Sequence, residues 1–510
     1  MLSKTFTYGL SGIDAYLIAI EVDTRRGIPS TTIVGLPDSA VKESRERVQS
    51  AVRNSGFELK PQKITINLSP ADTKKEGASF DLPIALGILA ASGHLCADTL
   101  NRFVFLGELS LDGKIRPVRG ALPISLCVDV RRFSGIILPE QNAREAAISQ
   151  RIPVYPVHSL NEAIDLISCP EHYRPYHINS QDILTSERHC ALDFSDVKGQ
   201  IAVKRGLEIA AAGGHNILMI GPPGSGKTML ARRIPTILPD LTLTESLETT
   251  KIHSVAGLLP PQTALVADRP FRSPHHTCSD IALIGGGSHP RPGEVTLAHN
   301  GILFLDELPE FSRNALESLR QPLEDHCVTV SRAAKSVRFP SKFMLVSSMN
   351  PCPCGFLSDP KKDCHCSPAQ IQKYMSKISG PLLDRIDIHL EVPALPPAEL
   401  LSASPAETSA AIKKRTATAR GVQLRRFHNT SIFCNAQMSH RDIRHVCRLC
   451  SEGKKLLRTA IEELGFSARA HDKILKVART IADLTGGGQI QPEHIAEAIQ
   501  YRYLDRNWWG

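Results

Sequence analysis

The 510-residue sequence has no hydrophobic run long enough to cross a bilayer. Its longest apolar stretch lies around Leu82 to Ser92, whereas a membrane-spanning helix needs about 20 consecutive apolar residues. The first nine residues also lack the apolar core of a secretory signal, and Asp14 and Glu21 follow soon after. The sequence therefore predicts a cytoplasmic protein with no membrane partner.

The sequence also lacks a strong excess of one charge, internal repeats and low-complexity tracts. It has 60 Lys and Arg against 52 Asp and Glu, a net charge of +8. This excess favours polyanionic partners only mildly. A hydrophobic content of 42% and a charged content of 22% are ordinary for a globular protein, and the length predicts roughly two to four domains.

The order of apolar and polar stretches predicts three domains and a linker. Residues 1–170 mix strand and helix patterns, including strand Lys63 to Asn67 and helices Ser39 to Ser55 and Phe80 to Ser92. A polar linker, a second α/β domain and a mostly helical domain follow, at residues 171–195, 196–393 and 394–510.

A strand, a glycine-rich turn and the start of a helix follow one another from Asn216 to Ile234. Glycines let backbone N–H groups surround phosphates at the positive end of a helix. Lys227 would neutralise the β- and γ-phosphates, and the Thr228 hydroxyl would complete a Mg²⁺ shell. The predicted ATP-binding residues are contiguous: Gly221, Pro222, Pro223, Gly224, Ser225, Gly226, Lys227, Thr228 and Met229.

Two further apolar strands end in polar side chains suited to nucleotide hydrolysis. Asp306 and Glu307 follow one strand, where Asp306 would hold Mg²⁺ and Glu307 would polarise the attacking water. Asn350 follows the next strand and can orient water against the γ-phosphate. Acidic pairs also cap helices, and an Asn before Pro351 also forms turns. The phosphate loop favours the catalytic interpretation.

A hairpin pattern precedes Asn350. Residues 328–339 alternate apolar and polar side chains on either side of an Ala-Ala tip. Arg332, Lys335 and Arg338 place positive charge at or near this tip, which suits contact with a DNA backbone. The alternative is that these basic side chains only face solvent.

Four of the thirteen cysteines fall within fifteen residues, as Cys352, Cys354, Cys364 and Cys366. Four thiolates can close a tetrahedral zinc site, and they leave no open position for catalysis. In a cytoplasmic protein such a cluster favours structural zinc over disulfides. His365 can replace one cysteine, and free thiols remain the alternative.

Several motifs around these sites resemble the magnesium-chelatase-like branch of the AAA+ superfamily. They lie at residues 272–279, 285–287, 292–301 and 380–387. With the N-terminal domain included, the whole chain resembles the ComM/YifB family of bacterial competence proteins. The resemblance implies an α/β fold with an AAA+ P-loop core and a helical lid, preceded by a Lon-protease-like α/β domain.

The resemblance also implies roles for two arginines far from the phosphate loop. Arg385 matches the arginine finger that reaches into a neighbouring subunit's site, and Arg469 matches the lid arginine that senses the γ-phosphate. A finger supplied by a neighbour implies an oligomer, which in this superfamily is usually a homo-hexamer. The long separation of Lys227 from Asp306 leaves room for the pore-loop insertion of this branch. Alternatively, both arginines form surface salt bridges.

The N-terminal domain resembles the Lon protease fold around its nucleophilic serine, at Thr73 to Asp81, with Ser79 in the place of the nucleophile. Lon-type cleavage needs a lysine to accept the serine's proton. Leu122 occupies that place, and leucine is no base. The sequence therefore predicts an inactive protease domain that serves assembly or DNA contact.

These expectations favour a DNA motor over two alternatives. The resemblance implies an ATP hydrolase and helicase that promotes branch migration in homologous recombination during natural transformation. Its partners would be single-stranded and branched DNA, and recombinases. A magnesium-chelatase motor subunit that remodels a protein partner is the main alternative, although such subunits lack a fused Lon-like domain. An ATP-dependent protease is disfavoured by Leu122.

Overall fold

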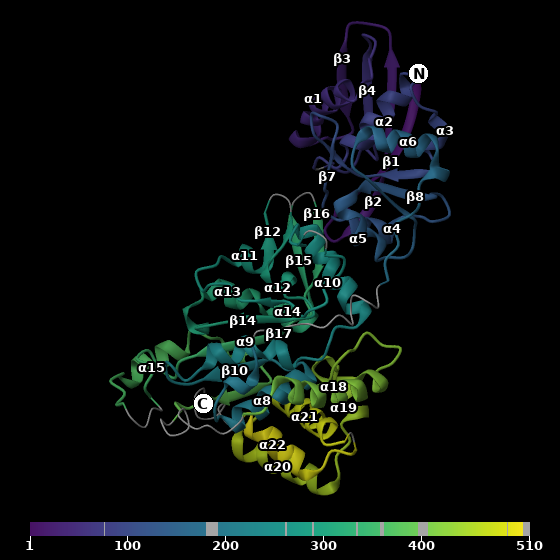
Figure 1. Ribbon diagram of the computed structural model, residues 1–510. Helices are drawn as coiled ribbons and strands as arrows, with labels where there is room; N and C mark the ends of the chain where they lie inside the picture. The colour runs from purple at the N-terminus through teal and green to yellow at the C-terminus, as the bar shows by residue number, and fades with distance from the viewer. Residues whose placement is uncertain are drawn as a thin grey trace. The chain divides into compact units, whose positions relative to one another are not determined.

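In the computed structural model the chain forms two compact units (Figure 1). Unit 1 comprises Met1–Ser186 and Leu243–Ala267, and unit 2 comprises Glu187–Thr242 and Asp268–Gly510. The structure describes residues 1–75, 77–179, 192–260, 263–287, 290–332, 335–357, 362–395, 406–486 and 488–502. The expected linker, residues 171–195, therefore falls partly outside the described residues. Each helix among the described residues is too short or too polar to span a membrane.

Unit 1 is built on a seven-stranded mixed sheet of order β3-β4-β2-β1-β5-β8-β9. β1 and β2 form a long antiparallel hairpin, and β5, β8 and β9 continue the sheet in parallel. Two short strands, β6 and β7, pair separately. The strands are β1 (Leu2–Ser11), β2 (Asp14–Arg25), β3 (Ser30–Val34), β4 (Lys63–Ser69), β5 (Phe103–Phe105), β6 (Glu108–Leu109), β7 (Ile115–Arg116), β8 (Gly135–Pro139) and β9 (Val154–Val157).

The helices of unit 1 form where the sequence caps or buries them. α1 begins after Asp38, whose carboxylate accepts a hydrogen bond from the Val41 N–H. α2 is buried at every residue, which explains the longest apolar run of the sequence as a core helix. The helices are α1 (Ser39–Asn54), α2 (Asp81–Ala91), α3 (Ala97–Leu100), α4 (Ala121–Cys127), α5 (Glu140–Ala147), α6 (Leu160–Ser168) and α10 (Leu243–Ala256).

α10 belongs to unit 1 although the sequence analysis assigned residues 196–393 to the ATPase core. It packs against α4, and the buried carboxylate of Glu145 accepts hydrogen bonds from Ser254 and from the Leu122 N–H. Burial raises the pKa of Glu145, against the opposing effect of these hydrogen bonds. Ala264 and Leu265 pack with Leu122. Apolar burial and a satisfied carboxylate therefore hold this insertion in unit 1.

Unit 2 contains an all-parallel sheet of order β11-β14-β17-β10-β18. Its three central strands are buried at every residue, and all their residues are apolar except Ser347 and Ser348 of β17, as expected for a parallel sheet covered on both faces. β12 pairs with β13 and β15 with β16 in two separate two-stranded sheets. The strands are β10 (Ile217–Ile220), β11 (Phe271–Arg272), β12 (Gly285–Gly286), β13 (Arg291–Pro292), β14 (Ile302–Leu305), β15 (Cys327–Arg332), β16 (Lys335–Pro340), β17 (Met344–Met349) and β18 (Ile388–Glu391).

One hydrophobic core joins this sheet to the helices of the C-terminal lid. The helices of the sheet region are α8 (Ile201–Gly213), α9 (Lys227–Ile237), α11 (Asp280–Ile284), α12 (Glu294–Leu297), α13 (Arg313–Ser318), α14 (Arg320–Asp325), α15 (Pro368–Met375) and α16 (Gly380–Leu383). The lid helices are α18 (Ser409–Arg426), α19 (His440–Val446), α20 (Ser451–Leu464), α21 (Ala468–Leu484) and α22 (Pro492–Gln500). The fold of unit 2 is thus a parallel α/β core with a helical lid, and unit 1 is a separate α/β unit.

A buried charged cluster fixes the lid against the sheet. Asp387, at the start of β18, forms an ion pair with Lys473 of α21 and lies 3.2 Å from Nδ1 of His215. Burial alone would raise the pKa of Asp387, but Lys473 and His215 hold it well below its usual range. His215 Nε2 also lies 2.8 Å from the Thr480 hydroxyl of α21. The segment around Arg385 and helix α21 are therefore joined through paired, buried side chains.

Candidate active site

The phosphate loop lies between β10 and α9, as the sequence predicts. Gly224 and Gly226 have φ angles of +77° and +89°, in the left-handed region that favours glycine. A Cβ on Gly221 would lie 2.1 Å from the carbonyl oxygen of Val392, so a side chain there would displace the backbone. The side-chain amide of Gln200 donates to the Ser225 carbonyl at 2.8 Å. Sequence reasoning missed this supporting contact, because Gln200 precedes the motif.

Lys227 begins α9 and is largely buried. Its ammonium group donates to the carbonyl oxygens of Gly221 and Pro222 at 2.7 and 2.9 Å, and to Oδ1 of Asn350 at 3.2 Å. Burial lowers the pKa of Lys227, whereas the carboxylates of Asp306 and Glu307 act against this shift. The structure therefore brings together the predicted phosphate-binding lysine and the predicted sensor asparagine.

The residues predicted to hold Mg²⁺ are also in contact. The Thr228 hydroxyl donates to Oδ2 of Asp306 at 2.8 Å. The hydroxyl of Ser348, in β17, donates to Oδ1 of the same carboxylate. A hydroxyl and a carboxylate at the end of a phosphate loop form the oxygen set that Mg²⁺ prefers, so these residues fit the ion. Ser348 was not predicted, although its place at the end of an apolar strand is a usable signal.

Glu307 has an unexpected partner in His276. The Nδ1 atom of His276 lies 3.5 Å from Oε2 of Glu307. Glu307 has a φ of +54°, which is uncommon for a residue with a side chain and typical of functional sites. The ring of His276 packs on His275 and Phe311. His276 is thus a candidate positioning residue for Glu307. The sequence feature that could have identified it is the motif at residues 272–279, which contains it.

The predicted arginine finger, Arg385, and the predicted lid arginine, Arg469, lie close together. Arg385 donates from Nη1 to the Pro381 carbonyl at 2.6 Å and from Nη2 to Glu324. Nη2 of Arg469, at the start of α21, lies 3.6 Å from the other carboxylate oxygen of Glu324. None of these contacts involves Lys227, whose ammonium group contacts Asn350 and the phosphate loop. The two arginines therefore share one carboxylate, which sequence reasoning did not anticipate.

The predicted DNA-contacting hairpin is β15–β16. Val330 pairs with Val337, and both are buried, whereas Thr329 and its partner Arg338 are exposed. The alternation of apolar and polar side chains is therefore present, with Arg338 on the exposed face. The hairpin tip and the side chains of Arg332 and Lys335 lie outside the described residues.

The cysteine cluster brings its four thiols together. Sγ of Cys352 lies 3.3 Å from that of Cys354 and 3.7 Å from that of Cys364. With Cys366 included, all four sulfur atoms lie within 4.8 Å of one another. Zinc–sulfur bonds of about 2.3 Å in a tetrahedron separate the sulfur atoms by about 3.8 Å. The donor set therefore fits a structural zinc ion.

This cysteine loop packs against the phosphate loop. Gly355 has a φ of +85°, and a Cβ added to it would lie 2.6 Å from Cδ of Pro223 and 3.9 Å from Cβ of Asn350. Any shift of the cysteine loop would therefore press on residues of the nucleotide site. A metal ion held here would fix that packing without taking part in the reaction.

In unit 1, Leu122 is fully buried and packs with Ile148, Ala264 and Leu265. Its position is thus an apolar contact for the insertion that contains α10. The ammonium group of Lys75, four residues before Ser79 in the chain, donates to the carbonyl oxygens of Pro70 and Thr73. The prediction that Ser79 is an inactive relic therefore still rests on Leu122, which is no base.

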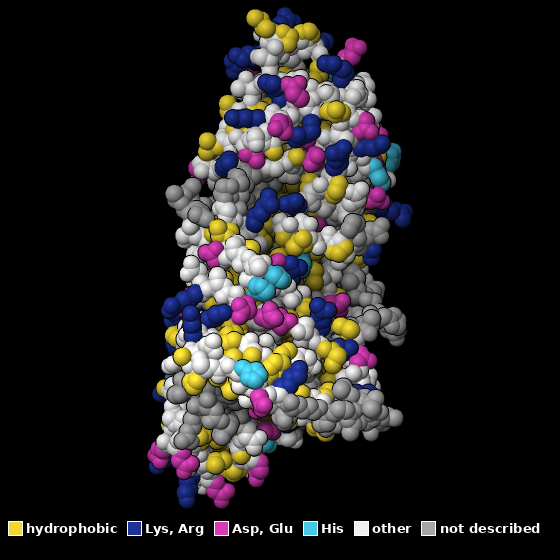
Figure 2. All heavy atoms as spheres, turned by 90° about the vertical axis from the view of Figure 1, so that its left-hand side faces the viewer, with side chains coloured by type: hydrophobic (Ala, Val, Ile, Leu, Met, Phe, Trp, Pro, Cys, Tyr) yellow, Lys and Arg dark blue, Asp and Glu magenta, His cyan; other side chains and the backbone are white. Residues whose placement is uncertain are grey.

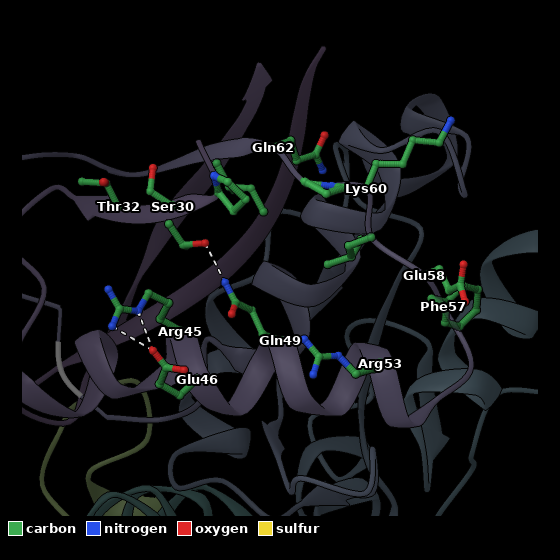
Figure 3. A pocket seen from close by; sticks show the side chains of 15 residues that line it. Ser30, Thr32, Arg45, Glu46, Gln49, Arg53, Phe57, Glu58, Lys60 and Gln62 are labelled. Atoms are coloured by element: carbon green, nitrogen blue, oxygen red, sulfur yellow. Dashed lines mark hydrogen bonds and ion pairs between the residues drawn. The ribbon is translucent and has the colours of Figure 1, made fainter. Parts of the chain in front are cut away.

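Unit 1 also has an open polar groove of about 810 Å³ between α1 and strand β3 (Figure 3). Arg45 pairs with Glu46 on α1, and Gln49 donates to the Thr31 hydroxyl at 2.7 Å. The lining in the described part of the chain has both charge signs and contains no Asp, His or Cys. These groups suit binding better than covalent catalysis, and Ser79 does not line the groove.

Three family models match successive parts of the chain. The model described as magnesium chelatase, subunit ChlI, matches residues 193–400. A second, described as subunit ChlI of Mg-chelatase, matches residues 20–142. A third, for the C-terminal part of the same subunit, matches residues 406–502. The matches thus include both structural units.

The full-length relatives agree with these models. The chain is 42% identical to competence protein ComM of Haemophilus influenzae, over 99% of this chain and 98% of the relative. It is 44% identical to the uncharacterized protein YifB of Salmonella typhimurium over the same shares. A weaker match, to Lon protease 2 of Bacillus subtilis, is 28% identical over 28% of this chain and 25% of that protein. The chain belongs to the ComM/YifB family of magnesium-chelatase-like AAA+ ATPases.

Proposed function

We propose that this ATPase is a hexameric DNA motor that promotes branch migration during homologous recombination. The name of the Haemophilus relative, a competence protein, favours a role in the uptake and integration of DNA during natural transformation. The observation that carries the proposal is the hairpin β15–β16. It lies in the chain between β14, which is followed by Asp306, and β17, which is followed by Asn350.

The hairpin suits a DNA contact because one of its faces is anchored and the other is free. Val328, Val330, Val337 and Phe339 are buried, so the hairpin has a fixed base. Arg338 lies on the exposed face, where a guanidinium group can contact phosphates. On the face drawn in Figure 2, Lys and Arg side chains are interspersed with Asp and Glu. A local basic element therefore suits DNA contact there better than a broad basic field.

The pairing of Arg385 with Arg469 supports the oligomeric part of the proposal. In the described residues both guanidinium groups contact Glu324, whereas Lys227 contacts Asn350. We infer that both arginines act on the nucleotide of a neighbouring subunit. A ring of identical subunits supplies such a neighbour at every site, and closed rotational symmetry is the usual result of head-to-tail contacts. Recombinase proteins that load DNA are possible further partners of the ring.

The cysteine cluster supports a structural zinc ion as part of the same motor. Cys352, Cys354, Cys364 and Cys366 offer four thiolates at fitting separations. Four protein ligands close the coordination shell, so the ion would stabilise the loop against Pro223 and Asn350. ATP and Mg²⁺ are the reacting cofactors, held by the phosphate loop, Thr228 and Asp306.

The test of the DNA motor is the change of both Arg332 and Lys335 to Ala. We expect DNA-stimulated ATP hydrolysis and the unwinding of branched DNA to be lost together. DNA affinity should also fall, and each lost phosphate contact should reduce the slope of log affinity against log salt by about one. The matched control changes Lys454 and Lys455, two exposed lysines of α20, and should behave like the parent protein.

Two outcomes would contradict the proposal at different levels. A hairpin variant that binds DNA, is stimulated and unwinds like the parent would remove the hairpin as the DNA grip. A parent protein whose hydrolysis ignores single-stranded and branched DNA would reject the DNA motor. That second result would leave the magnesium-chelatase alternative, a motor that remodels a protein partner.

A further inference from the structure

Glu324 joins three segments that the sequence places far apart. It lies near the end of α14, and its carboxylate contacts Arg385 after α16 and Arg469 at the start of α21. Each arginine uses Nη2, and each contacts a different carboxylate oxygen. One acidic side chain therefore contacts both arginines that we assign to the neighbouring subunit's nucleotide.

The ion pairs of Glu324 with the two arginines can be replaced by contacts of the arginines with another anion. The side chains of Glu324 and Arg469 are each 54% exposed, whereas Arg385 is only 11% exposed. Exposed ion pairs shift an equilibrium by only about one- to fivefold each, because water and salt screen them. A nucleotide phosphate carries more negative charge than a carboxylate and binds guanidinium groups well. The exposed pair of Arg469 with Glu324 is therefore readily broken, and the larger charge of a neighbouring phosphate also favours transfer of the more buried Arg385.

Glu324 is also close in the chain to the proposed DNA grip. α14 ends at Asp325, His326 takes a left-handed conformation, and β15 begins at Cys327. α14 packs against β15, and the Ser341 N–H after the hairpin donates to the His326 carbonyl at 2.9 Å. A displacement of the hairpin therefore moves the short helix that carries Glu324.

We propose that Glu324 is a latch that holds Arg385 and Arg469 in the resting chain and releases both when DNA engages the hairpin. The latch rests on the proposed function, because it needs both arginines to act on a neighbouring subunit. Glu324 is a positioning residue in this scheme. It competes with the neighbour's phosphate for the two guanidinium groups and touches no reacting atom. DNA then raises the rate by removing this competition.

The test is the isosteric change Glu324→Gln, which removes the charge and keeps the size. ATP hydrolysis is measured with and without single-stranded DNA over a range of protein concentrations. We expect the rate without DNA to rise about two- to tenfold, since the ion pairs of Glu324 with both arginines are lost. The ratio of the rates with and without DNA should fall. The double change Glu324→Gln and Arg385→Ala should lose the gain, because the freed arginine is then absent.

Two further variants serve as controls. Glu317→Gln removes the ion pair with Arg320, whose atoms lie 2.7 Å apart on neighbouring turns, and should behave like the parent. Glu324→Asp keeps the charge on a shorter side chain and should give a rate without DNA between those of the parent and Glu324→Gln. This partial rescue also serves if thermal melting shows that Glu324→Gln is poorly folded.

The outcomes separate the latch from the DNA motor. If DNA stimulates the parent but neither Glu324 variant raises the rate without DNA, the latch is wrong and the motor stands. If DNA leaves the parent unchanged but Glu324→Gln raises its rate, the latch holds the arginines and the DNA trigger is wrong. A lower rate for Glu324→Gln and an intermediate one for Glu324→Asp would mean that Glu324 assists the arginines, which overturns the proposal.

Discussion

The two units of this chain are both built from sheets and helices, but they differ in the side chains at the places where chemistry is expected. In unit 2 the loops that follow the parallel strands carry Lys227, Asp306 and Asn350, with side chains in mutual reach. In unit 1 the position that the Lon-like resemblance assigns to a catalytic lysine holds Leu122, which is buried against the insertion. The difference shows that function has to be argued from the side chains of a site and not from an α/β fold alone.

The insertion at residues 243–267 is part of the folded core of unit 1. Residues 243–267 interrupt the ATPase core in sequence but pack within unit 1, through α4 and the buried carboxylate of Glu145. Breaking this packing would expose both an apolar surface and an unpaired carboxylate. Part of the segment that separates Lys227 from Asp306 in the sequence is therefore folded into unit 1.

The largest expected effect is the loss of ATP hydrolysis when the candidate active site of unit 2 is changed. Glu307→Gln should retain ATP binding and lose turnover by about 10²–10⁴-fold, because the amide is a poor proton acceptor. Lys227→Ala should instead weaken binding, since it removes a charge beside the phosphates. Nucleotide affinity and steady-state hydrolysis distinguish the two variants. Normal hydrolysis by Glu307→Gln would refute the role of that carboxylate.

A second prediction concerns the cysteine loop. Protein purified without chelators should contain about one zinc ion per chain, and changing Cys352 and Cys354 to Ser should remove it, because two thiolates cannot fill a tetrahedral shell. Thermal stability should fall with metal loss. Elemental analysis and melting curves provide the measurement. Protein free of zinc would leave the four cysteines as free thiols.

A smaller effect is expected at His276. Changing it to Ala removes the ring that lies beside Glu307, so turnover should fall about three- to tenfold while ATP affinity is kept. Steady-state hydrolysis and nucleotide affinity provide the measurement. An unchanged rate would mean that the contact at 3.5 Å does not position Glu307.

The smallest effect is expected in unit 1. Ser79→Ala should leave ATP hydrolysis unchanged, and neither the variant nor the parent should cleave an unfolded protein substrate. The reason is that Leu122 offers no base to a nucleophilic serine. Proteolysis of casein that required Ser79 would show that unit 1 is catalytically active. It would also mean that a residue other than Leu122 accepts the proton of Ser79.

Local patterns predicted much of the fold. The helix expected at Ser39 to Ser55 is α1, the one expected at Phe80 to Ser92 is α2, and the strand at Lys63 to Asn67 lies within β4. β1 was not predicted, because the first nine residues carry no strong local strand signal. Its stability comes from ten paired positions with β2, which a local pattern does not reveal.

The candidate site was predictable where a motif carries its own geometry, as in the phosphate loop and the two strands that are followed by Asp306 and Asn350. The contact of His276 with Glu307 and the sharing of Glu324 by Arg385 and Arg469 were not. These contacts depend on how distant segments pack, and the exposed charges involved have many alternative partners. The placement of α10 in unit 1 was missed for the same reason.

The most direct test of the account mixes two inactive proteins, Lys227→Ala and Arg385→Ala. Each alone should hydrolyse ATP very slowly, since an arginine finger contributes about 10³–10⁵ in rate. In mixed rings, an intact phosphate loop from one subunit meets an intact Arg385 from the other, so part of the activity should return. Steady-state hydrolysis across mixing ratios, with a maximum at intermediate ratios, is the predicted result. No recovery at any ratio, in mixtures shown to form joint oligomers, would contradict a nucleotide site shared between subunits.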